Sequence, residues 1–244
     1  MNKKIFIIAL TCCMFICNAI VNTASATKLE KFHDMLHNNK YMMVYTEQSL
    51  FNNDNIRQNK TRITWVKDGA NEYYSNRMQE RNGFYHRGWL CVDGEYYQVI
   101  AVEKAGKQIE YHTHNSKSGI EKIPSDEGKS MLKNNHINQL IQLIYAGDNA
   151  MMKLRYVGEG ALDDGTTYED YVSYFDAMGI KQDGAPVRYI FSGDELKKII
   201  SKSVMTTLQG VSTETTDIVE FEKFTDIIDT DYFQLPVTQK VYTR

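Results

Sequence analysis

The chain has 244 residues, of which 24 % are charged and 42 % hydrophobic, and its formal net charge is −3 at neutral pH. This balance argues against a nucleic-acid-binding protein, which would carry an excess of Lys and Arg. Three of the four cysteines lie within the first 17 residues, so we expect no internal disulfide in the body of the chain.

The first 26 residues have the layout of a secretory signal peptide. Lys3 and Lys4 give a cationic start, residues 5–16 form an apolar run, and Ala24 and Ala26 are small residues at the two positions that a signal peptidase reads. An uncleaved membrane anchor is the alternative, but the apolar run is shorter than the roughly 20 residues that cross a bilayer. We therefore expect cleavage after Ala26, export, and a mature protein in the periplasm or outside the cell.

The mature region, residues 27–244, has the length of one ordinary domain. No apolar stretch after Ala26 approaches the length of a membrane span, so we expect a domain without a transmembrane segment. No repeat, low-complexity tract or linker divides this region. Cys91 is its only cysteine, so the hydrophobic core has to hold the fold without a disulfide.

The first part of the mature region predicts one short helix followed by strands. Leu29, Phe32, Met35 and Leu36 are spaced three or four apart, which is typical of one face of a helix. The sequence then changes to short runs rich in Tyr, Val, Ile, Trp and Thr, which favour strands. These predicted strands cover residues 41–46, 62–67, 89–92 and 95–100. The dipeptide Asp93-Gly94 between the last two predicts a tight hairpin.

A second, longer helix is predicted over residues 125–146, where apolar residues follow helical spacing. Ser125 can cap its start, and Gly147 can end it. Strands resume after it, and a third, short helix with a narrow apolar edge is predicted over residues 194–200. The predicted strands of this half cover residues 151–157, 168–175, 187–191, 204–208 and 217–224.

These elements predict an α+β fold in which two or three helices cover a large antiparallel sheet. So many strands at short spacing favour a strongly curved sheet or an unclosed β-barrel over a flat sheet, since curvature reduces the exposed edges. The helices would then cover the open face.

No residue pattern indicates an enzyme. His33 and His37 are spaced four apart on a helix, as in zinc proteases, but that motif needs a Glu and a further ligand, so two solvated histidines are the favoured interpretation. His112 and His114 alternate along a predicted strand, yet no further ligand is identifiable. Cys91 lies among apolar residues, which favours a buried side chain over a nucleophile. We predict no metal, no cofactor and no catalytic residue; an enzyme that uses either histidine pair through a metal is the less favoured alternative.

Aromatic and methionine side chains are abundant, with sixteen Tyr, ten Phe and eleven Met in the full chain. Ordinary core packing accounts for most of them. A curved sheet capped by helices can nonetheless enclose an apolar cavity, and flexible Met side chains suit an adaptable pocket. The residues that we expect to line this ligand cavity are Trp65, Trp89, Tyr97, Leu132, Ile137, Leu140, Ile141 and Ile144.

The order of elements resembles the family of the bacterial lipoprotein carrier LolA, with the receptor LolB and the regulator RseB among its relatives. The resemblance rests on an exported chain with an amino-terminal helix, a Tyr-rich first strand, the hairpin at residues 92–96, a helix midway and paired strands beyond it. Residues 231–236, of sequence DYFQLP, are similar to the closing F-x-L-P segment of these proteins. The resemblance covers nearly all of the mature chain.

This resemblance implies an unclosed antiparallel barrel with helices as a lid and a cavity that takes acyl chains or other apolar groups. The chain departs from the carrier itself, because no arginine matches the one that holds the carrier's lid closed. Two hypotheses follow. The first is an exported protein that binds a lipid or another apolar ligand and serves lipoprotein or envelope trafficking. The second is a cell-envelope interaction or sensor protein that uses the barrel as a scaffold for a lipoprotein or another envelope protein, without a ligand.

Overall fold

The computed structural model describes residues 27–51, 56–57, 60–80, 83–104, 110–111, 119–134, 137–145, 152–177, 180–206, 210, 212–234 and 242–243. The chain divides into two units, Met1–Lys31 and Phe32–Arg244, and the sheet lies entirely in the second. The predicted signal peptide, residues 1–26, lies outside the described residues. Within the described ranges, no helix is both long enough and apolar enough to cross a membrane.

The predicted first helix is confirmed, and strands dominate the rest of the chain. The helical elements are α2 (Leu29–His37), α3 (Ser125–Asn134), α4 (Gln139–Gln142) and the 3-10 turns η1 (Leu143–Tyr145) and η2 (Thr230–Phe233). The first strands are β1 (Lys40–Phe51), β2 (Ile56–Arg57), β3 (Thr61–Asp68), β4 (Asn71–Glu80), β5 (Gly83–Val92), β6 (Glu95–Lys104), β7 (Glu110–Tyr111) and β8 (Gly119–Ile123). The later strands are β9 (Met152–Ala161), β10 (Thr167–Ala177), β11 (Ile180–Ser192), β12 (Glu195–Thr206), β13 (Ser212–Thr225) and β14 (Tyr242–Thr243).

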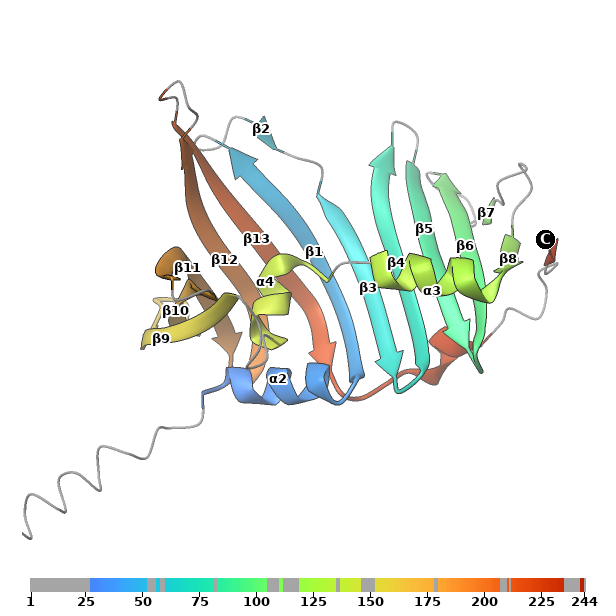
Figure 1. Ribbon diagram of the computed structural model, residues 1–244, viewed down its shortest axis with the longest axis horizontal. Helices are drawn as coiled ribbons and strands as arrows, with labels where there is room; N and C mark the ends of the chain where they lie inside the picture. The colour runs from blue at the N-terminus through green and yellow to red at the C-terminus, as the bar shows by residue number, and fades with distance from the viewer. Residues whose placement is uncertain are drawn as a thin grey trace, which may run out of the picture. The chain divides into compact units, whose positions relative to one another are not determined.

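All fourteen strands of the described chain belong to one sheet (Figure 1). Its order is β14-β8-β6-β5-β4-β3-β1-β13-β12-β11-β10-β9, with β2 paired to β1 and β7 paired to β6. Pairing is antiparallel throughout, except between β14 and β8. The strands β14 and β9 end this order without pairing to one another, so the sheet is unclosed. The α+β fold with a large antiparallel sheet and helices, predicted from the sequence, is confirmed in this open form.

The hairpin predicted at Asp93-Gly94 is also confirmed, because it joins β5 to β6. Asp93 and Gly94 both have positive φ, of 52° and 77°. A two-residue hairpin turn of type I′ needs positive φ at both central residues, which Asp tolerates and Gly adopts without strain. The turn sequence therefore sets the register in which Val92 pairs with Glu95.

Both faces of the sheet are covered at its centre, as β1 illustrates. Its side chains alternate between the two faces, so Tyr41, Met43 and Tyr45 lie on one face and Met42 and Val44 on the other. All five are at most 6 % exposed. A strand that is buried on both faces consists of a continuous apolar run, which is the pattern that residues 41–45 show.

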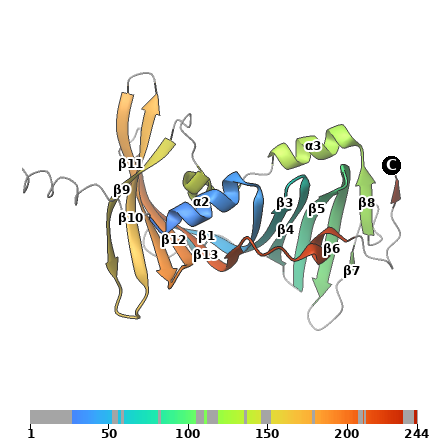
Figure 2. The same cartoon turned by 90° about the horizontal axis from the view of Figure 1, so that it is seen from below.

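The helices α3 and α4 cover different parts of one face of the sheet. Both lie in front of the sheet in Figure 1, and α3 lies above it in Figure 2. In α3, Gly128 lies directly against the Tyr96 ring of β6, where a Cβ atom would come within 2.3 Å of Cγ. Only glycine allows so close an approach. In α4, Leu140 and Ile141 are buried, and the backbone oxygen of Leu140 accepts a hydrogen bond from the Tyr189 hydroxyl of β11 at 3.5 Å.

The prediction of one continuous helix over residues 125–146 is wrong. The structure has α3, then a break, then α4 and η1. Asn138 causes a new start, because its side chain accepts a hydrogen bond from the Leu140 backbone N–H at 2.9 Å and so caps α4. Asn competes for backbone hydrogen bonds in this way and favours caps over helix interiors. The apolar residues do follow helical spacing, but most of them are divided between two separate helical segments, α3 and α4 with η1.

The opposite face of the sheet is covered by the segment around η2. Tyr232 packs against Tyr73 of β4 with 5.1 Å between ring centroids. Phe233 packs on the buried pair Leu90 and Tyr97. The segment thus provides the apolar cover for the face that carries Met42 and Val44.

The prediction of a helix over residues 194–200 is wrong, because β12 begins at Glu195. The register between β11 and β12 shifts at a bulge, where Ile190 pairs with Lys198 but Phe191 pairs with Leu196. The extra residue puts Leu196 and Ile199 on the same face of the strand, and they are 2 % and 0 % exposed. A spacing of three between two buried residues therefore imitates a helix.

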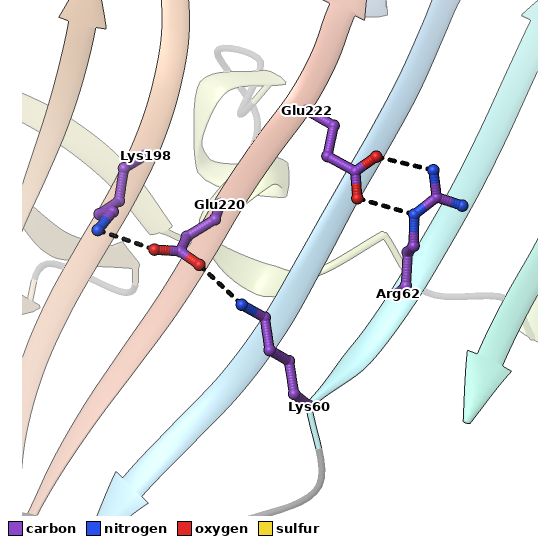
Figure 3. Close-up of polar contacts among 5 residues, drawn as sticks. All are labelled: Lys60, Arg62, Lys198, Glu220 and Glu222. Carbon is purple, nitrogen blue, oxygen red and sulfur yellow. Dashed lines mark hydrogen bonds and ion pairs between the residues drawn. The ribbon is translucent and has the colours of Figure 1, made fainter. Parts of the chain in front are cut away.

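Beyond the η2 cover, the second face carries a network of ion pairs that joins three strands (Figure 3). Glu220 of β13 receives hydrogen bonds from Lys60, which precedes β3, at 3.0 Å and from Lys198 of β12 at 2.8 Å. Arg62 of β3 binds Glu222 through two bonds of 2.8 Å. Since β1 lies between β3 and β13, the ion pairs made by Lys60 and Arg62 reach across it.

These contacts lower the pKa of both carboxyl groups below the ordinary value of 4.5, that of Glu220 mainly through Lys198 and then Lys60, that of Glu222 mainly through Arg62. A lowered pKa in the folded state contributes stability above pH 4.5 that is lost as the pH falls through the folded pKa. The carboxylates are 37 % and 51 % exposed, so solvent screening limits each contribution to roughly 1 kcal/mol or less.

We expect Glu222→Gln to lower the melting temperature at pH 7 by a few degrees. This deficit should shrink as the pH falls below 4.5 and through the lowered pKa of the wild-type carboxyl. Thermal melts at a series of decreasing pH values measure this, with Asp163→Asn in the exposed turn after β9 as the control. A deficit that does not shrink as the pH falls would mean that the substitution acts through packing and not through charge.

Candidate functional site

A hollow with a volume of about 380 Å³ opens on strands β9 to β12. This volume lies in the range typical of sites for small molecules. Its lining is mostly apolar and consists of Val157, Asp170, Tyr171, Val172, Pro186, Val187, Arg188, Ile200 and Lys202. An apolar depression with a few charged groups is the usual form of a ligand site.

The register of three strands brings the lining side chains together. Asp170 of β10 lies opposite Arg188 of β11, which in turn lies opposite Ile200 of β12. One step along, Val172 lies opposite Pro186. Because opposite residues of antiparallel strands share a face, these five side chains form one patch.

The other face of the same strands is part of the core. Tyr189 and Ile199, which are the chain neighbours of the lining residues Arg188 and Ile200 and pair with one another, are fully buried. Ser201 donates a hydrogen bond from its hydroxyl to the Pro186 backbone oxygen at 3.0 Å, and Ser173 donates one to Ala185 at 3.1 Å. The floor of the hollow is therefore fixed by the packed side chains and hydrogen bonds behind it.

Val157 forms one side of the hollow and owes its position to a bulge in β9. Gly158 pairs with Asp170, but Tyr156 pairs with Tyr171, so Val157 is the extra residue. Its exposed fraction is 60 %, which is high for a valine in a strand. Bulges redirect individual side chains, and this one leaves an apolar side chain in solvent at the rim of the hollow.

The two cations of the hollow differ in how they are neutralised. Arg188 binds Asp170 through two bonds of 2.7 and 2.8 Å, and its guanidinium lies 3.9 Å from the centre of the Tyr168 ring. The hydrogen bond to Asp170 raises the pKa of Arg188. Lys202 is exposed and forms no ion pair with the described residues, and its neighbour on β13 is the uncharged Thr216. The hollow therefore presents one unneutralised positive charge at an apolar surface.

A second, smaller hollow of about 230 Å³ is polar. It lies beside the start of α4, where the Asn138 amide donates to the Glu47 carboxylate at 2.9 Å and Ser49 binds Asp217. Both carboxylates are thus engaged by neighbours. These hydrogen bonds tie α4 to β1 and β1 to β13.

The eight residues predicted to line a cavity fall into separate places. Trp65 and Trp89 lie on the face covered by α3 and α4, on either side of Tyr74, with ring centroids 5.1 and 4.9 Å from it. Tyr97 lies on the opposite face, against Leu90 and Phe233. The structure does not bring Tyr97 together with the two tryptophans.

The predicted cavity residues in and around the helices also lie in two separate places. Leu140, Ile141 and Ile144 are buried in α4 and η1, close to β11. Leu132 in α3 and Ile137 before α4 are half-buried. That these residues line a ligand cavity stays a prediction.

The candidate catalytic and metal residues are placed as follows. The His33 and His37 rings stack with 5.9 Å between centroids, beside the exposed Tyr145. Burial raises the pKa of the Cys91 thiol, which disfavours the nucleophilic thiolate. His112 and His114 lie outside the described residues.

The lining of the 380 Å³ hollow was missed from the sequence. One signal could have indicated it: in β12, Lys198, Ile200, Lys202 and Val204 alternate with buried residues, so apolar side chains occur on the face that two lysines mark as outward. Outward apolar residues on neighbouring strands suggest a binding surface. Neither the strand order nor the bulge at Val157 could be read from the sequence.

No protein-family model matches the chain, and no curated protein matches it. Among solved structures, the complex of MucA and MucB from Pseudomonas aeruginosa is similar at 8 % identity over 80 % of this chain and 92 % of the matched chain, with a TM-score of 0.17. MucB in complex with MucA(peri) is similar at 8 % identity over the same shares, with a TM-score of 0.16. Likenesses of this size carry no argument about the fold or the function of this chain.

Proposed function

We propose that this chain is a non-catalytic binding protein that holds an apolar ligand in the hollow of β9 to β12. The observation that carries the proposal is the hollow itself, of about 380 Å³ and lined mostly by apolar side chains. Each buried methylene group of a ligand contributes about 0.8 kcal/mol, so a chain of ten contributes about 8 kcal/mol before the cost of association. A single acyl chain would thus bind with at most roughly micromolar affinity, and the cost of association weakens it from this limit.

Export and membership of a LolA-like fold belong to the same proposal. They are supported by the signal-peptide pattern of residues 1–26 and by the sequence resemblance. A protein outside the cytoplasm that binds an acyl chain would serve lipid or lipoprotein trafficking in the cell envelope. Amino-terminal sequencing of the secreted protein tests export, because a mature chain that begins at Thr27 is expected.

Binding is tested by titrating the purified protein with cis-parinaric acid, a fluorescent fatty acid. We expect saturable binding to one site, and we expect Ile200→Asp to weaken it at least tenfold, because a carboxylate in the floor opposes an apolar ligand. The matched control is Val204→Asp, on the same strand and face but outside the lining, where the wild-type side chain is 65 % exposed. Both variants should melt close to the wild-type temperature.

Binding that does not saturate, or that Ile200→Asp and Val204→Asp affect equally, contradicts the proposal. Mass spectrometry of lipid extracted from the purified protein provides the second measurement. A specific acyl lipid that copurifies with the wild type and is lost from Ile200→Asp is the expected outcome.

A ligand between the sheet and the helices is the second candidate, because three buried polar atoms there lack hydrogen-bond partners in the described part of the chain. They are the Tyr45 hydroxyl, the Trp89 indole nitrogen and the Asn76 side-chain oxygen. Buried polar groups are normally paired, so a ligand group or a water would complete them. If the ligand binds at this second site, the same titration should show weaker binding in Trp89→Phe and unchanged binding in Ile200→Asp.

The envelope interaction or sensor protein without a ligand is the alternative function. It predicts that neither titration nor lipid extraction detects a ligand. Crosslinking in cells should then capture one specific envelope protein, and the same crosslink should form in Ile200→Asp.

A further inference from the structure

The charges around the hollow indicate what kind of apolar ligand it takes. Its lining contains two cations, Arg188 and Lys202, and one carboxylate, Asp170. Asp170 is fully engaged by Arg188 through both of its oxygens. The ammonium group of Lys202 is left as the charge available to a ligand.

We infer that the ligand of the hollow is a single-chain amphiphile with one anionic group, whose chain lies on Val172, Pro186 and Ile200 and whose charge pairs with Lys202. This inference rests on the proposed function. A carboxylate and a phosphate share the required chemistry. The ligand class is therefore a fatty acid or a single-chain alkyl phosphate.

The position of Lys202 suits this role. It lies two residues after Ile200 on β12, and alternate residues of a strand point to the same face about 6 to 7 Å apart. That spacing places the ammonium group at the end of the apolar floor. A long flexible side chain with a compact charge can follow a head group at the rim while the ligand's chain stays on the floor.

Arg188 has a different part. Its guanidinium is held by Asp170 on one side and by the Tyr168 ring at 3.9 Å on another, so it is a fixed wall of the hollow. A cationic ligand would meet two positive side chains and would have to break the pair with Asp170 to find a partner. An uncharged ligand would cover the apolar lining of the hollow but would offer no negative charge to the Lys202 ammonium group beside it.

The size of the hollow limits the ligand to one chain. At about 380 Å³ it lies near the lower end of the volumes of small-molecule sites. A two-chain phospholipid would extend well beyond the lining residues. We therefore expect dodecanoic acid to bind and a two-chain phosphatidylglycerol to bind at least tenfold more weakly.

The test compares three ligands of equal chain length, dodecanoic acid, dodecyl phosphate and dodecanol, by displacement of cis-parinaric acid at pH 7.5. Wild-type protein should bind the two anions five- to tenfold more tightly than the alcohol. In Lys202→Gln the anions should fall to the affinity of the alcohol, while the alcohol itself changes less than twofold. Lys202→Arg should retain the preference for anions.

The matched control is Lys198→Gln, which removes a lysine from the same strand and face. Lys198 is paired with Glu220 and lies four residues from Lys202, about 13 Å along the strand, which exceeds the Debye length of about 8 Å at physiological salt. It should leave all three affinities within twofold of wild type. Raising the salt to 1 M should weaken the anions and not the alcohol.

The outcomes separate this inference from the function on which it rests. Failure of all three ligands to displace the probe contradicts the proposed function. Equal binding of acid and alcohol, or equal losses for both in Lys202→Gln, overturns the anionic ligand while the apolar site stands. Whichever of dodecanoic acid and dodecyl phosphate binds more tightly identifies the head group.

Discussion

Replacing Ile141 by Asp is expected to remove at least about 4 kcal/mol of stability, which is a large part of the roughly 5 to 15 kcal/mol that holds an ordinary domain folded. Ile141 is 0 % exposed on α4. The substitution loses about 1.5 to 3 kcal/mol of apolar burial and adds the cost of a carboxylate without a partner in the core. Thermal melts followed by circular dichroism measure the effect.

The matched control is Gln142→Asp, because Gln142 is the next residue of the same helix and is exposed. It should shift the melting temperature by no more than a few degrees. A small shift in Ile141→Asp together with weaker binding of cis-parinaric acid would mean that α4 is a mobile lid over the second candidate site, between the sheet and the helices, and not fixed core, because lids belong to the least stable parts of a structure.

Replacing Glu72 by Ala is expected to cost about 3 kcal/mol. Glu72 is 7 % exposed and accepts hydrogen bonds from the Trp65 indole at 3.0 Å and from Lys67 at 2.8 Å. Its removal leaves a buried indole N–H unpaired and a lysine that is only 24 % exposed without its counter-charge. Breaking a buried pair from one side is costly for this reason.

Chemical denaturation measures this loss, with Asp183→Ala as the control. Asp183 pairs with Arg155 at 2.6 Å, but the two side chains are 63 % and 55 % exposed, so that pair should contribute less than about 1 kcal/mol. Equal losses in the two variants would show that the Glu72 cluster is no more than a surface ion pair. Trp65 fluorescence should shift to longer wavelength in Glu72→Ala if water replaces the carboxylate.

Much of the fold could be predicted because local chemistry decides it. The apolar run of residues 41–45 and the Asp93-Gly94 turn are local signals, and the structure follows both. The prediction failed where tertiary structure changes the meaning of a spacing. The bulge in β12 places Leu196 and Ile199 on one face, which a helix would also do.

The candidate site was harder to predict than the fold. Trp65 and Tyr97 both read as apolar strand residues, and only the register shows that they lie on opposite faces of the sheet. The hollow is formed by side chains from four consecutive strands, and the register of these strands and the bulge at Val157 decide which side chains share its face. Ion pairs could not be predicted from the sequence either. The sequence alone does not show that Asp170 pairs with Arg188 and that Lys202 has no ion-pair partner among the described residues.

The pairing of β1 with β13 determines the order in which the sheet can be completed. β1 meets β3 through a short connection, but its other edge pairs with β13, from Met42 opposite Thr225 to Phe51 opposite Thr215. Pairing across so long a loop is slow, because the entropy of closing the loop is lost before the contacts form. Until the last part of the chain arrives, the aromatic and methionine-rich β1 is an open edge. A nascent or carboxyl-terminally clipped chain therefore exposes a template for aggregation that the complete protein covers.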